Sequence, residues 1–385
     1  MRSYSIKLLD VKEDDKFGYT IRNAVTSVSG ASVGGLVKIP KYCSKKLSVT
    51  SPIREILITL TLSEIIEIDG KNEKRNAFIS DRISAKLSSG LINVVFVRIS
   101  RADGAGFTSL KSNIDKIAEF VVDMIYKHPK VEIVSLPYME FLKNDSPDDL
   151  IEFDSLIRER ISQITNIESG TGKIGYFLPS YYTREKIPEL VENYTSKFGS
   201  NGLFICDLDG ATFSSVGYSV ISQVARKIEN EHGEENYSLY AFSLKEKKSS
   251  GNEAPAEDIL ALLSQASIVG PSHKRRILPK DIVKKLKENN EFNPKILEKD
   301  DYLYYQYLNY NSPKKLDEWF STGFKNESLT NERKRHFTEV YNSQITTDIL
   351  KELASNPDDS IKKLKREDFI EILRYIGNKR KKIER

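Results

Sequence analysis

The sequence predicts an α/β fold on a parallel sheet, either doubly wound or closed into a (β/α)8 barrel. Six short apolar runs between Leu91 and Gly270 alternate with stretches that carry apolar residues at every third or fourth position. Such alternation is typical of parallel β/α units. Because parallel strands need covered faces and right-handed crossovers, only these two architectures suit the pattern. Both place their chemistry at the carboxyl ends of the strands.

Six strands alternating with helices are expected in this stretch. One such helix carries its apolar residues between Ile114 and Ile125. The strands are Val94–Val97, Val131–Val134, Ile174–Leu178, Leu203–Cys206, Leu239–Phe242 and Ala266–Val269. Residues 1–90 form a β-rich entry segment, in which Glu55–Thr61 is a good strand by composition. One or two strands from this segment bring the total to eight, the number that closes a barrel.

The chain divides by composition into residues 1–277, which form the barrel with its entry segment 1–90, and a helical, basic C-terminal region 278–385. Residues 245–256 are polar and predict a long loop after a strand end. Asp301–Tyr310 holds five tyrosines in ten positions. It is interpreted either as a helix packed through a tyrosine face or as an aromatic surface for base stacking. A last helix is expected at Asp368–Gly377.

Positive charge gathers in two places, although the formal net charge is only +4. Residues 360–385 contain ten Lys or Arg against four acids, and residues 274–287 contain seven against one. Local positive charge is typical of surfaces that bind a nucleic-acid backbone, while a solvated helix face explains the same pattern. The candidates for contact with nucleic acid are Lys274, Arg275, Arg276, Lys379, Arg380 and Lys381.

Composition narrows the class of protein further. No apolar run approaches the length of a membrane span, and the first residues lack the apolar stretch of a secretion signal. The two cysteines, Cys43 and Cys206, provide neither a disulfide framework nor a closed zinc site. We therefore expect a soluble, cytoplasmic protein with no membrane partner, no metal and no cofactor.

The first candidate site is the turn after the strand that ends near Ile99. It reads Asp103-Gly104-Ala105-Gly106-Phe107. A carboxylate followed by two glycines suits general acid–base work with backbone close to a ligand. An aspartate that caps a turn explains the same residues.

Three further strand ends carry polar residues. Asp207 and Asp209 follow Cys206, and one of them is expected to face the site as a nucleophile while the other caps a helix. Tyr181 and Tyr182 follow Leu178 and suit stacking on a flat substrate or a helix start. Ser272 and His273, with the cations at 274–276, follow the last strand, where late barrel loops often bind phosphate.

The order of these strand ends resembles the tRNA-guanine transglycosylase superfamily, TIM-barrel enzymes that exchange a nucleobase for guanine or a 7-deazaguanine. The turn at Asp103–Phe107 is similar to the family's Asp-Ser-Gly-Gly-Phe turn, and Ile174–Phe177, Gly202–Ile205 and Pro255–Leu260 stand where the family has its next strands and a helix. The resemblance covers residues 90–277. It implies a TIM-like barrel in which Asp103 recognises the base and moves a proton.

Two departures from the family keep several functions open. The family's nucleophilic aspartate ends the final strand, where this chain has Gly270, and no cysteine follows Cys206 to build the family's zinc site. The first expectation is base exchange in DNA or tRNA, with a purine or 7-deazapurine as the base and Asp209 or Asp207 as the attacking group. The second is a non-catalytic nucleic-acid-binding subunit that works with a protein partner. The third is a barrel enzyme acting on a phosphorylated small molecule.

Overall fold

The computed structural model describes most of the chain between residues 53 and 271 and selected segments on either side. The described residues are 6–14, 19–26, 36–37, 53–88, 91–142, 145–165, 173–179, 186–198, 202–208, 218–232, 237–244, 253–256, 258–263, 265–271, 293–307, 318, 330–357 and 359–360. Two regions for which the sequence makes predictions lie outside the described residues. They are the basic segment 274–287 and the expected helix at 368–377 with its basic tail.

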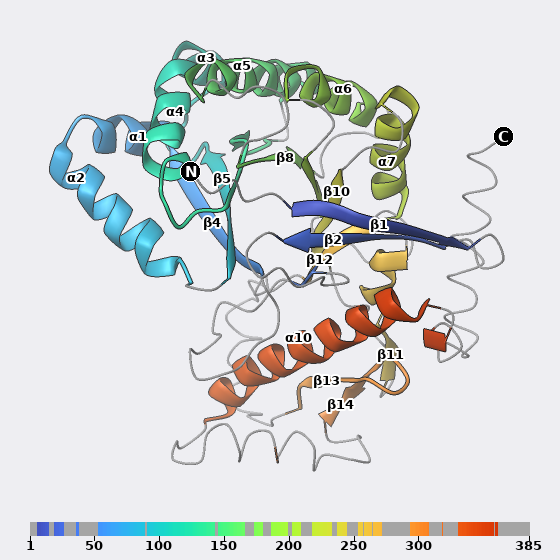
Figure 1. The fold of residues 1–385 in the computed structure, drawn as a ribbon. Coiled ribbons are helices and arrows are strands. Elements are labelled where there is room, and N and C mark those ends of the chain that lie inside the picture. Colours follow the sequence, from blue (N-terminus) through green and yellow to red (C-terminus); the bar gives the residue numbers. More distant parts are fainter. Residues whose placement is uncertain are drawn as a thin grey trace.

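A curled parallel sheet forms the centre of the molecule (Figure 1). Seven of its strands neighbour one another in the order in which they occur in the chain. They are β4 (Ile53–Thr61), β5 (Ile92–Ser100), β6 (Ile133–Ser135), β8 (Ile174–Leu178), β9 (Leu203–Asp207), β10 (Ser238–Leu244) and β12 (Ala266–Pro271). A doubly wound sheet reverses its order at a switch point. This order never reverses, so the sheet is the wall of a half-barrel.

Two short strands extend the sheet. β7 (Tyr138–Met139) pairs with β5, and β3 (Leu36–Val37) runs parallel to β12 at the end opposite β4. Two strands from the first 90 residues therefore join the sheet, as expected. Within the described residues no pairing joins β3 to β4, so closure of the barrel stays a prediction.

Helices fill the crossovers and lie in an arc around the convex side of the sheet (Figure 1). Between β4 and β5 the chain forms α1 (Leu62–Asp69), α2 (Asn72–Ala77), a π-helical turn η1 (Phe78–Ile83) and a 3-10 turn η2 (Ser84–Lys86). The later crossovers contain α3 (Phe107–Ser112), α4 (Ile114–Val121), the π-helical turn η3 (Val122–Tyr126), α5 (Pro147–Thr165), α6 (Ile187–Phe198) and α7 (Tyr218–His232). The connection from β10 to β12 uses β11 (Glu253–Pro255) and a 3-10 helix η5 (Ile259–Leu263) instead.

Local sequence explains where the first crossover begins. Thr61 ends β4 and is the N-cap of α1, since its side chain accepts a hydrogen bond from the N–H of Glu64. The Glu64 carboxylate returns the contact by accepting from the N–H of Thr61 at 2.8 Å. This capping box satisfies two N–H groups that the helix cannot use internally. The chain therefore turns sharply from strand to helix at the carboxyl edge of the sheet.

A second unit lies beside the half-barrel and is formed largely by the C-terminal region. It contains the antiparallel sheet β11–β14–β13, with β13 (Lys295–Glu298) and β14 (Leu303–Gln306), and the long helix α10 (Asn331–Ser355). The side-chain amide of Asn342 on α10 donates to the carbonyl of Lys295 and accepts from the N–H of Leu297, each at 2.9 Å. These bonds occupy the edge of β13 that faces away from β14.

Two local expectations about this region are corrected. The tyrosine segment is a strand at Leu303–Gln306 and not a helix, because aromatic side chains suit a pleated, half-buried surface and Tyr302, at φ 57°, ends the preceding turn. The polar stretch 245–256 is a loop only in part, since Glu253–Pro255 pairs with β14. Tyr304 also donates a hydrogen bond to Asp258 at 3.0 Å, which fastens the C-terminal unit to the β10–β12 connection.

At the other end of the chain, β1 (Ile6–Asp14) and β2 (Tyr19–Thr26) form an antiparallel hairpin. β1 makes contact with β10, and β2 makes contact with β12 and η5. In the described part of the chain, no helix is both long enough and apolar enough to cross a membrane.

Candidate active site at the carboxyl edge of the sheet

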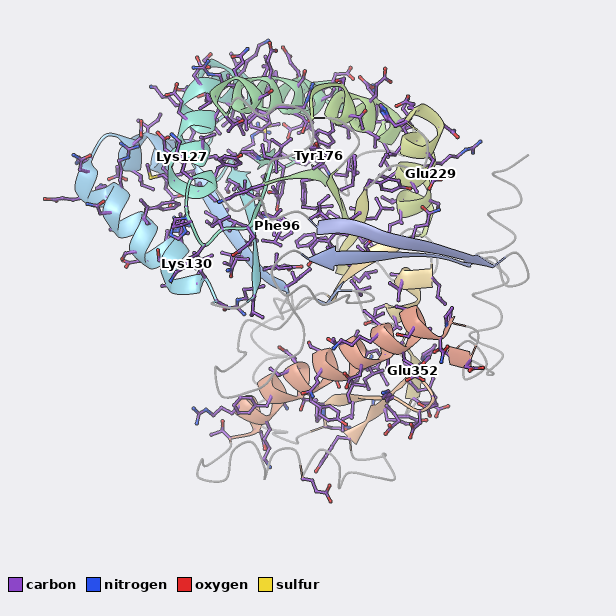
Figure 2. All side chains as sticks on the ribbon, in the orientation of Figure 1. Phe96, Lys127, Lys130, Tyr176, Glu229 and Glu352 are labelled. Carbon is purple, nitrogen blue, oxygen red and sulfur yellow. The ribbon has the colours of Figure 1, made fainter. Side chains whose placement is uncertain are left out.

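The strands alternate between two separate apolar layers. Outward residues such as Val95, Phe204 and Val269 pack with the helices in the larger buried cluster. Inward residues such as Phe96, Ile205 and Ile268 form a second cluster inside the curl. Figure 2 shows this division, with Phe96 on the concave side of the sheet and Tyr176 beneath the helices. A filled interior of this kind is typical of barrels, whose inward side chains stack in layers.

Three inward phenylalanines form an aromatic layer inside the curl: Phe96 on β5, Phe177 on β8 and Phe242 on β10. The ring centres of Phe96 and Phe242 lie 4.4 Å apart, and Phe177 is about equally far from both, at 6.0 and 5.9 Å. Tyr138 of β7 stacks on Phe177 at 4.0 Å with nearly parallel rings. Phe242 and Tyr138 are only half-buried, so the layer presents aromatic surface toward the carboxyl edge.

Polar side chains follow this layer at the carboxyl edge. They are Arg98, Tyr138, Glu140 and Asp207, and we call them the mouth cluster. In the strand register Asp207 lies beside Phe242, and Arg98 lies beside Tyr138. Burial raises the pKa of the Tyr138 phenol, and the negative charge of Asp207 raises it further. The raised pKa keeps the Tyr138 phenol protonated near neutral pH, so that it can donate a hydrogen bond at this edge.

The Arg98 side chain is held by an ion pair with Glu140. One terminal nitrogen of Arg98 lies 2.8 Å from Oε1 of Glu140. The other carboxylate oxygen accepts from the Ser100 hydroxyl at 2.8 Å and from the N–H of Arg101 at 3.2 Å. Although burial opposes the effect, these hydrogen bonds and the two arginine charges lower the pKa of Glu140. Glu140 is consequently an anion that fixes the end of β5 against β7.

A second polar contact spans the curl. The Tyr240 phenol on β10 donates a hydrogen bond to the Glu55 carboxylate on β4. Both groups also lie close to Gly270 on β12, where an added Cβ would stand 2.7 Å from the Tyr240 ring and 3.0 Å from Oε1 of Glu55. The first and sixth strands of the half-barrel, β4 and β10, are thus close enough for their side chains to meet. A side chain at position 270 has no room because the Tyr240 and Glu55 side chains occupy the space beside the Gly270 Cα.

The structure places Asp103 at the same edge of the sheet but ties its carboxylate to helix α1. Oδ2 accepts from the N–H and the hydroxyl of Ser63, at 3.0 and 2.9 Å, and Oδ1 accepts from the N–H of Ala105 at 3.2 Å. The bond from the Ser63 N–H is the main reason that the pKa of Asp103 is lowered. The carboxylate therefore caps a helix and a turn, and its role in base recognition stays a prediction.

The remaining residues of this turn serve the same local geometry. Gly104 has φ +78°, a conformation that side-chain-bearing residues rarely adopt. Gly106 is the N-cap of α3, and Phe107 packs against the outer, helix-covered cluster. Phe107 thus packs with the helices and not with the inward cluster that contains the aromatic layer.

Of the other sequence candidates, only Asp207 lies within the described residues. The undescribed positions are Asp209, Tyr181, Tyr182, Ser272, His273, Lys274, Arg275, Arg276, Lys379, Arg380 and Lys381. The neighbouring Cys206 faces the helices, and burial, followed by the charge of Asp207, raises the pKa of its thiol to about 12. Its thiol is thus unsuited to nucleophilic work. No group of three His, Cys, Asp or Glu in the described segments is placed to hold a metal.

Sequence reasoning missed Glu55, Arg98, Tyr138 and Glu140. The available signal was polar residues at inward positions of otherwise apolar strands, since Arg98 falls two residues after Phe96 and Glu55 two after Ile53. The protein is thus a parallel β/α half-barrel with a cluster of charged and phenolic side chains above an aromatic layer. In comparisons with known proteins, no family model matches the chain and no curated protein matches it significantly.

Proposed function

We propose that the protein exchanges a purine-type base in a nucleic acid, with Asp207 acting at the reacting sugar carbon. The observation that carries this proposal is the position of Asp207, the last residue of β9, beside Phe242 of the aromatic layer in the strand register. Catalytic groups of barrel enzymes stand at the carboxyl ends of strands. A target base would have to leave its stack to reach this edge.

The mouth cluster supplies a role for each partner in such a reaction. The Asp207 carboxylate forms a bond to C1 of the pentose as the bond from C1 to the ring nitrogen of the base breaks. The electron pair of that bond leaves with the base, which takes its proton through a hydrogen bond from Tyr138 or from water. An incoming base then attacks C1, the C1–O bond to Asp207 breaks, and the N–H proton of that base returns to the Tyr138 oxygen or to water. The aromatic layer provides a stacking surface for the planar base.

The same proposal includes a closed, TIM-like barrel of eight strands. Three observations support closure: the unreversed strand order, the parallel pairing of β3 with β12, and the contact of Glu55 with Tyr240. In this arrangement β3 occupies the gap between β12 and β4. Leu57 on β4, at the end of the sheet opposite β3, is a large apolar side chain that is 47% exposed.

A second candidate, a non-catalytic nucleic-acid-binding subunit, draws support from Gly270. The resemblance expects an acid at the end of the last strand, and here Tyr240 and Glu55 occupy the space of any side chain at that position. Either Asp207 has taken over the reaction, or the barrel binds nucleic acid without altering it.

Label exchange separates these candidates. Purified protein is incubated with labelled guanine or a labelled 7-deazaguanine and either duplex DNA or unmodified tRNA. Base exchange predicts that label enters one polymer, and that the Asp207→Asn variant incorporates at least about 100-fold less, because the attacking carboxylate is gone. Retention of both polymers without any incorporation would reject exchange and favour the binding subunit.

A further inference from the structure

Arg98 is oriented at the mouth cluster by Glu140, whose own carboxylate is fixed by several hydrogen bonds. Its partner Glu140 uses both carboxylate oxygens, one for Arg98 and the other for Ser100 and the N–H of Arg101. Arg101 is itself fixed, since its Nε donates to the carbonyl of Ala105 at 2.9 Å and its guanidinium pairs with the largely buried Asp145. The ion pair therefore orients a guanidinium at the edge of the sheet.

The bond to Glu140 leaves most of the binding capacity of Arg98 unused. A guanidinium carries five N–H donors in a planar fork, and this contact uses one terminal nitrogen. Nε is buried without a hydrogen-bond partner in the described part of the chain, and the side chain as a whole is 36% exposed. The register places Arg98 beside Tyr138, on the inward side where Asp207 lies.

We propose that Arg98 binds a phosphate oxygen of a phosphorylated pentose whose C1 lies at Asp207. The fork geometry of a guanidinium matches phosphate, and Arg held by a carboxylate is already oriented for it. Glu140 acts as the positioning residue and does not touch the substrate. The inference rests on the proposed function because it needs the sugar at Asp207. The phosphate belongs either to a nucleic-acid backbone or to a free sugar phosphate.

The experiment measures binding of three probes to the full-length protein. They are ribose 5-phosphate, a fluorescent guanine-containing oligonucleotide, and the same oligonucleotide with uncharged methylphosphonates flanking the guanine. The test variants are Arg98→Met and Arg98→Lys. The matched control is Arg160→Met, because Arg160 also pairs with carboxylates, Asp115 at 2.9 Å and Glu119 at 3.1 Å, but on the helical surface. Thermal unfolding confirms that each variant is folded.

We expect Arg98→Met to weaken binding of a phosphate-bearing probe at least tenfold, Arg98→Lys to weaken it less, and Arg160→Met to leave it unchanged. For the oligonucleotide, loss of one phosphate contact should also reduce the slope of log affinity against log salt by about one. The methylphosphonate probe should bind wild type and Arg98→Met equally. Dependence on Arg98 for the oligonucleotide alone would identify the backbone as the source, and dependence for ribose 5-phosphate alone would identify a free sugar phosphate.

The inference is overturned if Arg98→Met binds both phosphate-bearing probes as tightly as wild type does. It is also overturned if Arg98→Met weakens binding of the methylphosphonate probe as much as binding of the unmodified oligonucleotide. Its failure is distinguishable from that of base exchange. If Arg98→Met still exchanges base with an unchanged KM, the phosphate contact is rejected and base exchange is retained. If binding depends on Arg98 but no label is exchanged, base exchange is rejected and the phosphate contact is retained.

Discussion

At the scale of single residues, Asp154 illustrates how a buried carboxyl controls its surroundings. The Tyr194 oxygen lies 2.7 Å from Oδ1 of Asp154 and 2.7 Å from the carbonyl oxygen of Phe177. A phenol has one proton to donate. The Asp154 carboxylate and the Phe177 carbonyl therefore compete as acceptors for the single phenol proton of Tyr194. Burial raises the pKa of Asp154 to about 6, against the opposing Tyr194 bond and Arg158 charge.

This geometry predicts a pH dependence of stability. Because the pKa of Asp154 is raised in the folded state, its ionisation costs stability as pH rises from about 4 to about 6. The free energy of unfolding should fall by about 2 to 3 kcal/mol over that window from this group. Asp154→Asn keeps an amide oxygen that can accept from Tyr194, and it cannot ionise. Urea denaturation from pH 4 to 7 should show the variant without this slope, and an unchanged slope would reject the assignment.

A second residue-scale prediction concerns Asp103. Asp103→Ala removes the acceptor for the Ser63 N–H in the first turn of α1. We expect the free energy of unfolding to fall by about 1 kcal/mol, as for a lost N-cap. Asp103→Asn keeps one acceptor oxygen and should recover part of the loss. If Asp103→Ala abolishes base exchange while stability is unchanged, Asp103 serves the reaction and not the helix.

At the scale of elements, the strand positions could be predicted from sequence, whereas the side chains inside the half-barrel could not. All six expected strands of the region 91–270 are present. They could be predicted because strands buried on both faces appear in the sequence as nearly continuous apolar runs. β5 is buried at nearly every residue for this reason. The short strands β3 and β7 have two residues each, too few to give a periodic signal.

The candidate site was predictable only where it follows a strand. Asp207 was found because it ends β9, whereas Arg98 and Glu55 lie within strands and their inward direction depends on register. Asp103 was expected in the site for the same positional reason, but its carboxylate bonds to α1. A position at a strand end thus predicts that a residue lies at the edge of the sheet. The neighbouring backbone N–H groups determine the direction in which its carboxylate points.

The packing of Tyr240 and Glu55 against β12 can be tested at Gly270. A methyl group at this position would meet the Tyr240 ring at 2.7 Å and the Glu55 carboxylate at 3.0 Å. We expect Gly270→Ala to lower the free energy of unfolding by about 1 to 3 kcal/mol through overpacking. Combining it with Tyr240→Leu should recover part of that loss in denaturation experiments. Additive losses in the double variant would show that Tyr240 does not fill this space.

At the scale of the whole molecule, the half-barrel and the C-terminal unit are joined by the β10–β12 connection. β11 leaves the half-barrel to pair with β14, and Asn342 of α10 occupies the outer edge of β13. Asn342→Ala should lower the free energy of unfolding by about 1 to 3 kcal/mol, since two hydrogen bonds are lost and backbone groups of β13 lose their partners. Ser355→Ala, at the exposed end of the same helix, is the control and should change it little.

The most direct test of the account is a covalent trap at Asp207. Protein is mixed with end-labelled guanine-containing DNA or tRNA without free base, quenched in denaturant and analysed by gel and intact mass. The account predicts an adduct of protein and polymer, with one guanine lost, in wild type and Arg160→Met, and no adduct in Asp207→Asn. Base exchange by Asp207→Asn at the wild-type rate would contradict it.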